Sequence, residues 1–205
     1  MHLADIGVKC HNCGITFVSK QIPLIVDTGQ RNSELRLILG GNSEQFEPYT
    51  VCTCPSCGLA DWATAFGKTD EVAVLNQALS TPHLQFRTAA LAAERTGKSF
   101  HAIGLFYLYA AWCADDINAI PQAREYRRLA VDAFYKSLTD GSCPPSQRAE
   151  IEYLIGELLR RSGDFVNSVE YLKEVVAGLP GKYAVMARKV MRLSQEGRLD
   201  AIAFD

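Results

Sequence analysis

Residues 149–180 read AEIEYLIGELLRRSGDFVNSVEYLKEVVAGLP, and this pattern predicts two packed helices joined by a tight turn. Gly156 allows the helices to approach closely, because glycine has no side chain to hold them apart. Gly163 and Asp164 form the turn between the helices, and Pro180 ends the second helix. The apolar residues recur at helical spacing and form the seam between the two helices: Ile155, Leu159, Phe165, Val169, Leu172 and Val175.

The same periodicity extends over most of residues 67–205, where short polar or Gly- and Pro-containing stretches separate the apolar runs. Short connections make consecutive helices antiparallel neighbours, as in a bundle or a helical-repeat array. The pattern predicts seven helices, at about Asp70–Leu79, Thr81–Thr96, Ser99–Asn118, Pro121–Leu138, Pro145–Ser162, Phe165–Ala177 and Gly181–Gln195.

The stretch 149–180 resembles a tetratricopeptide repeat (TPR) in its period, its glycine positions and its final proline. It departs from that family at Glu152, where tryptophan is common, and at Ser168, where alanine is usual. The resemblance implies a concave groove that binds a protein or peptide partner. The side chains that it would place in this groove are Tyr153, Glu157, Arg160 and Arg161.

Two short cysteine motifs in the first third of the chain predict a metal site. Residues 10–14 read CHNCG and residues 54–58 read CPSCG, so each forms a CxxCG turn that aims two thiolates at one ion. Together Cys10, Cys13, Cys54 and Cys57 supply four thiolates, which close a tetrahedral coordination sphere. The sequence therefore predicts structural zinc. An iron–sulfur centre uses the same ligands, and a dithiol–disulfide pair is the redox alternative.

A fifth cysteine, Cys52, lies two residues before the second motif. On an extended strand Cys52 and Cys54 face the same side, so Cys52 is the alternative ligand. The favoured interpretation makes it a buried free thiol instead, because only Cys54 and Cys57 share the CxxCG turn.

Composition narrows the classes of partner. The 205 residues carry a net charge of −2, and neither the region up to Phe66 nor the remainder is basic. This argues against a protein that binds nucleic acid mainly through phosphates. The sequence shows no secretory signal and no apolar run of membrane-spanning length, so we expect no membrane contact and a reducing cytoplasm.

The order of motifs resembles a bacterial family of unknown function that has a zinc-ribbon-like head and a TPR-like tail. The most specific stretches are the CPSCG turn, AAWC at residues 110–113 and LIGELLRRSGD at residues 154–164. The expected fold class is α+β and mostly α. Residues 1–66 are expected to form the zinc-ribbon-like β head, and residues 67–205 the TPR-like antiparallel helical array.

The expected function is that of a non-enzymatic, zinc-binding adaptor or scaffold that mediates protein–protein interaction, and a homodimer is plausible. The alternative is a zinc-ribbon protein that binds nucleic acid or the ribosome. A thiol-redox or other enzyme is the least favoured class, because the sequence has no phosphate-binding glycine loop, no HExxH and no nucleophile motif.

Overall fold

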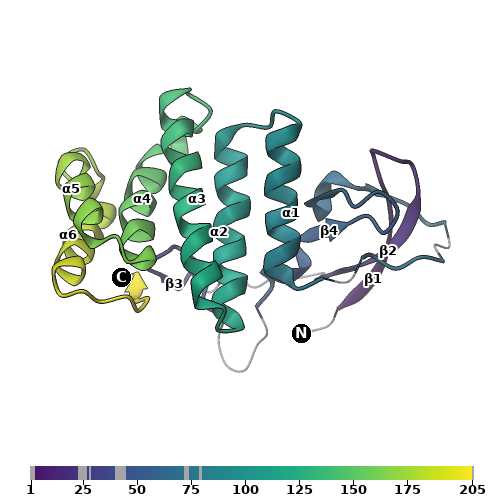
Figure 1. The fold of residues 1–205 in the computed structure, drawn as a ribbon, viewed down its shortest axis with the longest axis horizontal. Coiled ribbons are helices and arrows are strands. Elements are labelled where there is room, and N and C mark those ends of the chain that lie inside the picture. Colours follow the sequence, from purple (N-terminus) through teal and green to yellow (C-terminus); the bar gives the residue numbers. More distant parts are fainter. Residues whose placement is uncertain are drawn as a thin grey trace.

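A computed structural model describes residues 3–22, 27, 29–39, 45–71, 74–78 and 80–204. It shows a small β-rich region, the head, followed by six helices in a row (Figure 1). The predicted α+β class with mostly helical content is confirmed. The proposed division into domains at residue 66 stays a prediction.

The helices follow the predicted order closely. Because their apolar residues recur at helical spacing, each helix buries one face against its neighbours. Their bounds are α1 Pro82–Arg95, α2 Phe100–Asp116, α3 Ile120–Thr139, α4 Arg148–Ser162, α5 Phe165–Val175 and α6 Gly181–Gln195. Six of the seven predicted helices are therefore present.

The helix predicted at Asp70–Leu79 is wrong over the residues that the structure describes, which exclude residues 72, 73 and 79. Asn76 forms a parallel bridge with Val18. The Val18 amide donates to the Leu75 carbonyl at 2.7 Å, and the Gln77 amide donates to the Val18 carbonyl at 2.8 Å. Since the backbone groups of this segment pair with the head, they are not used in a helix.

The head consists of two small antiparallel sheets. In the first, β1 (Ala4–Lys9) lies between β2 (Thr16–Gln21) and β6 (Gly67–Lys68). The second is the hairpin of β4 (Val51–Thr53) and β5 (Ala60–Trp62). Single-turn 3₁₀ helices at Glu47–Tyr49 and Ala63–Ala65 flank this hairpin, and a third at Pro145–Gln147 precedes α4.

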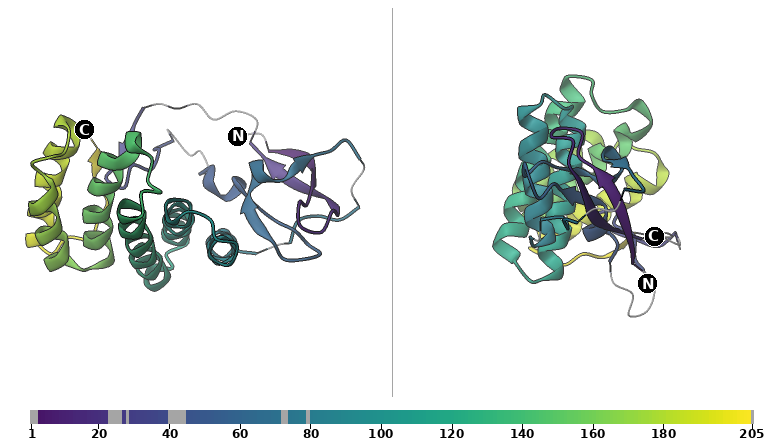
Figure 2. Two further views of the ribbon diagram at one scale, coloured as in Figure 1. Left: turned by 90° about the horizontal axis from the view of Figure 1, so that it is seen from above. Right: turned by 90° about the vertical axis from the view of Figure 1, so that its right-hand side faces the viewer.

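A third strand pair joins distant parts of the chain. β3 (Arg31–Asn32) pairs antiparallel with β7 (Ala203–Phe204), near the C-terminus. The C-terminus lies beside the helices at the end of the molecule away from β1 and β2 (Figures 1 and 2). Part of the segment between the two cysteine motifs therefore reaches across to the far helices.

Two apolar cores result. The larger runs through the helices and takes in Val51 and Ala60 of the β4–β5 hairpin. Trp62, at the end of β5, stacks on Phe106 of α2 with ring centroids 4.6 Å apart, so this hairpin lies on the helical array. The smaller core holds six buried residues of the head, namely Val8, Cys10, Phe17, Cys52, Cys54 and Phe66.

Candidate metal centre

The two CxxCG motifs fold into matching turns. The Gly14 amide donates to the Cys10 carbonyl at 2.9 Å, and the Gly58 amide donates to the Cys54 carbonyl at 3.0 Å. Both glycines have positive φ, 76° and 70°, a left-handed conformation that strongly favours glycine. The first turn connects β1 to β2 and the second connects β4 to β5, so two hairpins present their thiols to one point.

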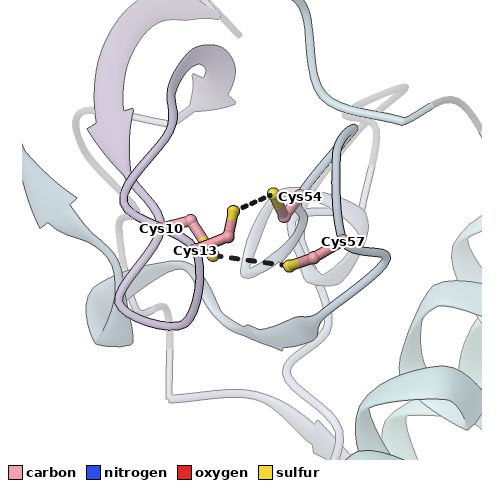
Figure 3. A group of neighbouring side chains, drawn as sticks. All are labelled: Cys10, Cys13, Cys54 and Cys57. Atoms are coloured by element: carbon pink, nitrogen blue, oxygen red, sulfur yellow. Dashed lines mark hydrogen bonds between the residues drawn. The ribbon is translucent and has the colours of Figure 1, made fainter.

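The four sulfurs lie at distances that suit a tetrahedral metal site. The Cys10 and Cys57 sulfurs are 3.7 Å apart, and the Cys13 and Cys54 sulfurs are 3.6 Å apart (Figure 3). All four lie within 4.8 Å of one another. Zinc–sulfur bonds of about 2.3 Å in a tetrahedron separate the sulfurs by about 3.8 Å. The four cysteines are therefore arranged as four thiolates around one metal ion would be.

A disulfide between these cysteines would require a sulfur–sulfur distance of about 2.0 Å. All seven cysteines of the chain lie in its described part and are free thiols. The arrangement consequently supports metal binding over a resting disulfide.

The surroundings shift the pKa values of three of the four thiols. Cys10 and Cys54 are buried, whereas Cys13 and Cys57 are exposed. Burial raises the pKa of Cys10, and it raises the pKa of Cys54 to about 12. A hydrogen bond with the Asn12 side chain lowers the pKa of Cys57 to about 6. Since a metal binds thiolates, it must displace the proton of Cys54, whereas Cys57 ionises readily. The sequence analysis did not identify Asn12 as part of the site.

Cys52 lies outside the four-sulfur group. It is buried on β4, and its sulfur is 2.9 Å from the Ser19 hydroxyl oxygen. Burial raises the pKa of the Cys52 thiol, which keeps it protonated. The structure thus places Cys52 in the small core of the head, where it contacts strand β2.

The groove expected on the first helix of the TPR-like pair is not open at its predicted residues. Tyr153, Glu157 and Arg160 are each 0% exposed. The Tyr153 hydroxyl donates to the Ser33 carbonyl at 2.8 Å, and Arg160 Nη2 donates to the Asp200 carbonyl at 2.9 Å. These three residues therefore do not form the predicted partner-binding groove, because other segments of the same chain cover their side chains.

The charges of these residues are paired inside the protein. Arg160 donates to both oxygens of Glu157, from Nε at 2.7 Å and from Nη2 at 2.6 Å. Arg161, the fourth predicted groove residue, binds Asp115 at 2.7 Å and lies 3.6 Å from Glu34. The pair of Glu157 and Arg160 is local to α4, whereas the contacts of Arg161 join positions that are distant in the sequence, so local patterns gave no signal for the latter.

A second ion-pair group, centred on the buried Arg36, ties the segment between the two cysteine motifs to α2. Arg36 binds both oxygens of Glu47, at 2.9 and 3.0 Å, and both oxygens of Asp116, at 2.7 and 2.8 Å. Arg36 also lies over the ring of Trp112, with its guanidinium carbon 5.8 Å from the ring centroid. Asp116, at the C-terminal end of α2, therefore fixes this segment to the helices.

Comparison with known proteins gives one family. The model of the family described as "Uncharacterized protein conserved in bacteria (DUF2225)" matches residues 71–196, more than half of the chain. The match spans α1 to α6 and begins after the last of the four cysteines. Neither the curated proteins nor the solved structures include a match to the chain. Within the part described, no helix has both the length and the apolarity needed to cross a bilayer.

Proposed function

The chain belongs to this bacterial family, and we propose that it is a non-enzymatic adaptor with a structural zinc ion in its head and a partner-binding helical array. The observation that carries the proposal is the group of four cysteine sulfurs within 4.8 Å of one another. Four thiolates leave no coordination position for water or substrate. A metal in this site would therefore organise the head, with no direct part in chemistry.

The size of the head supports a structural role for zinc. Its separate core holds only six buried residues, and two of them, Cys10 and Cys54, belong to the sulfur group. So small a core stabilises a fold weakly without a metal or a disulfide. Zinc held by Cys10, Cys13, Cys54 and Cys57 would join the β1–β2 and β4–β5 hairpins. Seven free thiols suit a reducing compartment such as the cytoplasm.

The helical array supports the adaptor part of the proposal. Successive helices connected by short loops stack side by side (Figure 1), an arrangement that exposes a long surface to partners. The close contact of α4 and α5 at Gly156 agrees with TPR-like packing. An alanine Cβ at this position would lie 2.3 Å from the Leu172 side chain. We retain the TPR-like assignment as part of the proposal, with a protein or peptide as the partner.

The test uses full-length protein purified from its native host. We expect about one zinc per chain by elemental analysis and a reproducible protein partner after mild cross-linking. Iron in place of zinc would overturn the structural-zinc assignment. Binding to RNA or DNA that weakens steeply with salt, with no protein partner, would favour the nucleic-acid alternative instead.

A further inference from the structure

Residues 198–204, called the strap below, follow α6 and lie across α4 beside β3 (Figure 1). Strand β7, at the end of the strap, pairs antiparallel with β3 over two residues of each strand. The Ser33 amide donates to the Ile202 carbonyl at 2.6 Å, and the Ile202 amide donates to the Ser33 hydroxyl at 3.2 Å. The strap therefore lies as an added strand along the edge of β3.

Two arginines of α4 hold the strap by its backbone. Arg160 donates to the carbonyls of Arg198 and Asp200, and Arg161 donates to the carbonyl of Leu199. Every strap residue offers such a carbonyl whatever its side chain, because the peptide group is the same. The contacts with α4 would therefore hold an extended segment of another sequence equally well.

The strap contributes little to the core that it covers. None of its side chains is buried, whereas Arg160 beneath it is 0% exposed. Its largest apolar side chain is Phe204, whose ring centroid lies 5.5 Å from that of Tyr153 and 5.7 Å from that of Tyr183. Backbone pairing and one aromatic side chain are the contacts by which an extended peptide binds the edge of a sheet.

A cavity beside Phe204 is an independent observation at the same place. It has a volume of about 320 Å³, and its lining includes Leu35, Tyr183 and Phe204 itself. The Lys182 ammonium borders it and lies 5.9 Å from the centroid of the Phe204 ring. The strap thus leaves space at its aromatic contact, and the same site can accept another aromatic side chain.

We propose that the strap is an intramolecular competitor at a docking site for the adaptor's partner. The site consists of the β3 edge, the guanidinium groups of Arg160 and Arg161, and the rings that receive Phe204. Its ligand is an extended segment of the partner with one aromatic residue, which adds to β3 as a strand. This inference rests on the proposed adaptor function and identifies the chemistry of its partner.

The buried arginine favours exchange of one segment for another over an empty site. Without the strap, Arg160 would lose two carbonyl acceptors and keep only Glu157, and unsatisfied buried donors are unfavourable. A helical partner segment fits poorly, because its carbonyls already accept within the helix. Displacement also differs from opening the expected TPR groove, since Tyr153 still donates to the Ser33 carbonyl.

The test measures peptide binding to the zinc-loaded, full-length protein by fluorescence anisotropy. The fluorescein-labelled peptide has the sequence of residues 198–205, RLDAIAFD, and a matched peptide has alanine in place of phenylalanine. Phe204→Ala loosens the strap and leaves the receiving site unchanged. Because competition reduces the fraction of free sites, this variant should bind the phenylalanine peptide about five- to tenfold more tightly than the unmodified protein does.

Further variants locate the binding. Added to Phe204→Ala, Tyr183→Ala should weaken binding of the phenylalanine peptide about two- to tenfold and reduce its advantage over the alanine peptide. Tyr135→Ala is the matched control, a tyrosine on α3 that packs on Tyr171 outside the cavity. It should leave peptide binding unchanged.

Equal binding by the unmodified protein and Phe204→Ala, with helical circular dichroism intact, would overturn the inference. Equal binding of the two peptides would do the same. A dimer of the unmodified protein that becomes monomeric in Phe204→Ala would assign the site to a second copy of the chain and overturn the partner assignment.

The proposed function is judged separately, by capture of a partner from the native host. If the unmodified protein and Phe204→Ala capture the same partner equally, the adaptor stands and the competition by the strap fails. If neither protein captures a partner, the adaptor itself fails.

Discussion

Glu34 and Arg127 form a buried ion pair between segments 93 residues apart in the sequence. Arg127 donates from Nε at 2.6 Å to one Glu34 oxygen and from Nη2 at 2.8 Å to the other. Asp115 and Arg161 extend the pair into a group of alternating charges. The insert between the two cysteine motifs is thereby fixed to α3, so ionic contacts within the large core help to hold the head and the helices together.

This ion pair predicts an acid-sensitive fold. Burial alone would raise the pKa of Glu34, but Arg127 and its neighbours hold that pKa at about 2, below the ordinary value of 4.5. A lowered pKa gives stability that is fully present above the ordinary value and is lost as the pH falls towards the folded value. We expect the thermal unfolding temperature, followed by circular dichroism, to drop between about pH 4.5 and pH 2.

Glu34→Gln isolates this contribution. At neutral pH the variant should lose roughly 3 kcal/mol of stability, because the buried guanidinium of Arg127 loses the buried one of its two charged partners and keeps only Asp115. Between pH 4.5 and pH 2 its unfolding temperature should vary less than that of the unmodified protein. Glu125→Gln, at an exposed position, should change neither quantity. An unaltered pH profile in Glu34→Gln would contradict the assignment.

Local sequence patterns correctly predicted the helices and the cysteine turns, because short-range interactions determine both. Six helices followed from apolar spacing, because burial of one face imposes the helical period on the sequence. The sulfur group followed from two CxxCG turns, since each turn brings two cysteines together without help from the rest of the fold. Gly156 also behaved as expected, with α5 packed directly against it.

The errors arose where long-range contacts decide the structure. The resemblance to a tetratricopeptide repeat placed Glu157 and Arg160 in an open groove. In the structure they pair with each other, and residues 198–200 cover Arg160. Likewise, the segment around Asn76 has enough apolar residues for a helix but pairs with β2 instead. No local pattern reports a partner that lies far away in the sequence.

The sulfur geometry predicts different roles for two neighbouring cysteines. Cys54→Ser removes one of the four ligands, so it should lower the zinc content well below one per chain and lower the head's stability. Cys52→Ser should retain its zinc, because Cys52 lies outside the sulfur group and a hydroxyl can still pair with Ser19. Elemental analysis of both purified variants makes the comparison. Loss of zinc in Cys52→Ser would place that residue among the ligands.

Removal of the metal should affect the two cores unequally. We expect a chelator to disorder the head, because two of the six residues in its small core are sulfur ligands. The helices have their own larger core, so the helical circular dichroism should fall by less than about a fifth. Hydrogen exchange should increase in β1, β2 and β4 and change least in α4 and α5. Uniform loss of protection across both regions would show that the head and the helices unfold together.

The contact between α4 and α5 predicts opposite effects for two glycine substitutions. In Gly156→Ala the new methyl would lie 2.3 Å from Leu172, which costs about 1–3 kcal/mol and exceeds the gain in helix propensity of roughly 1 kcal/mol. Gly181→Ala, in the first turn of α6, meets nothing within 4 Å and should be neutral or stabilising. Chemical denaturation should therefore rank Gly156→Ala least stable, and equal stability of the two variants would contradict the close packing of the helices.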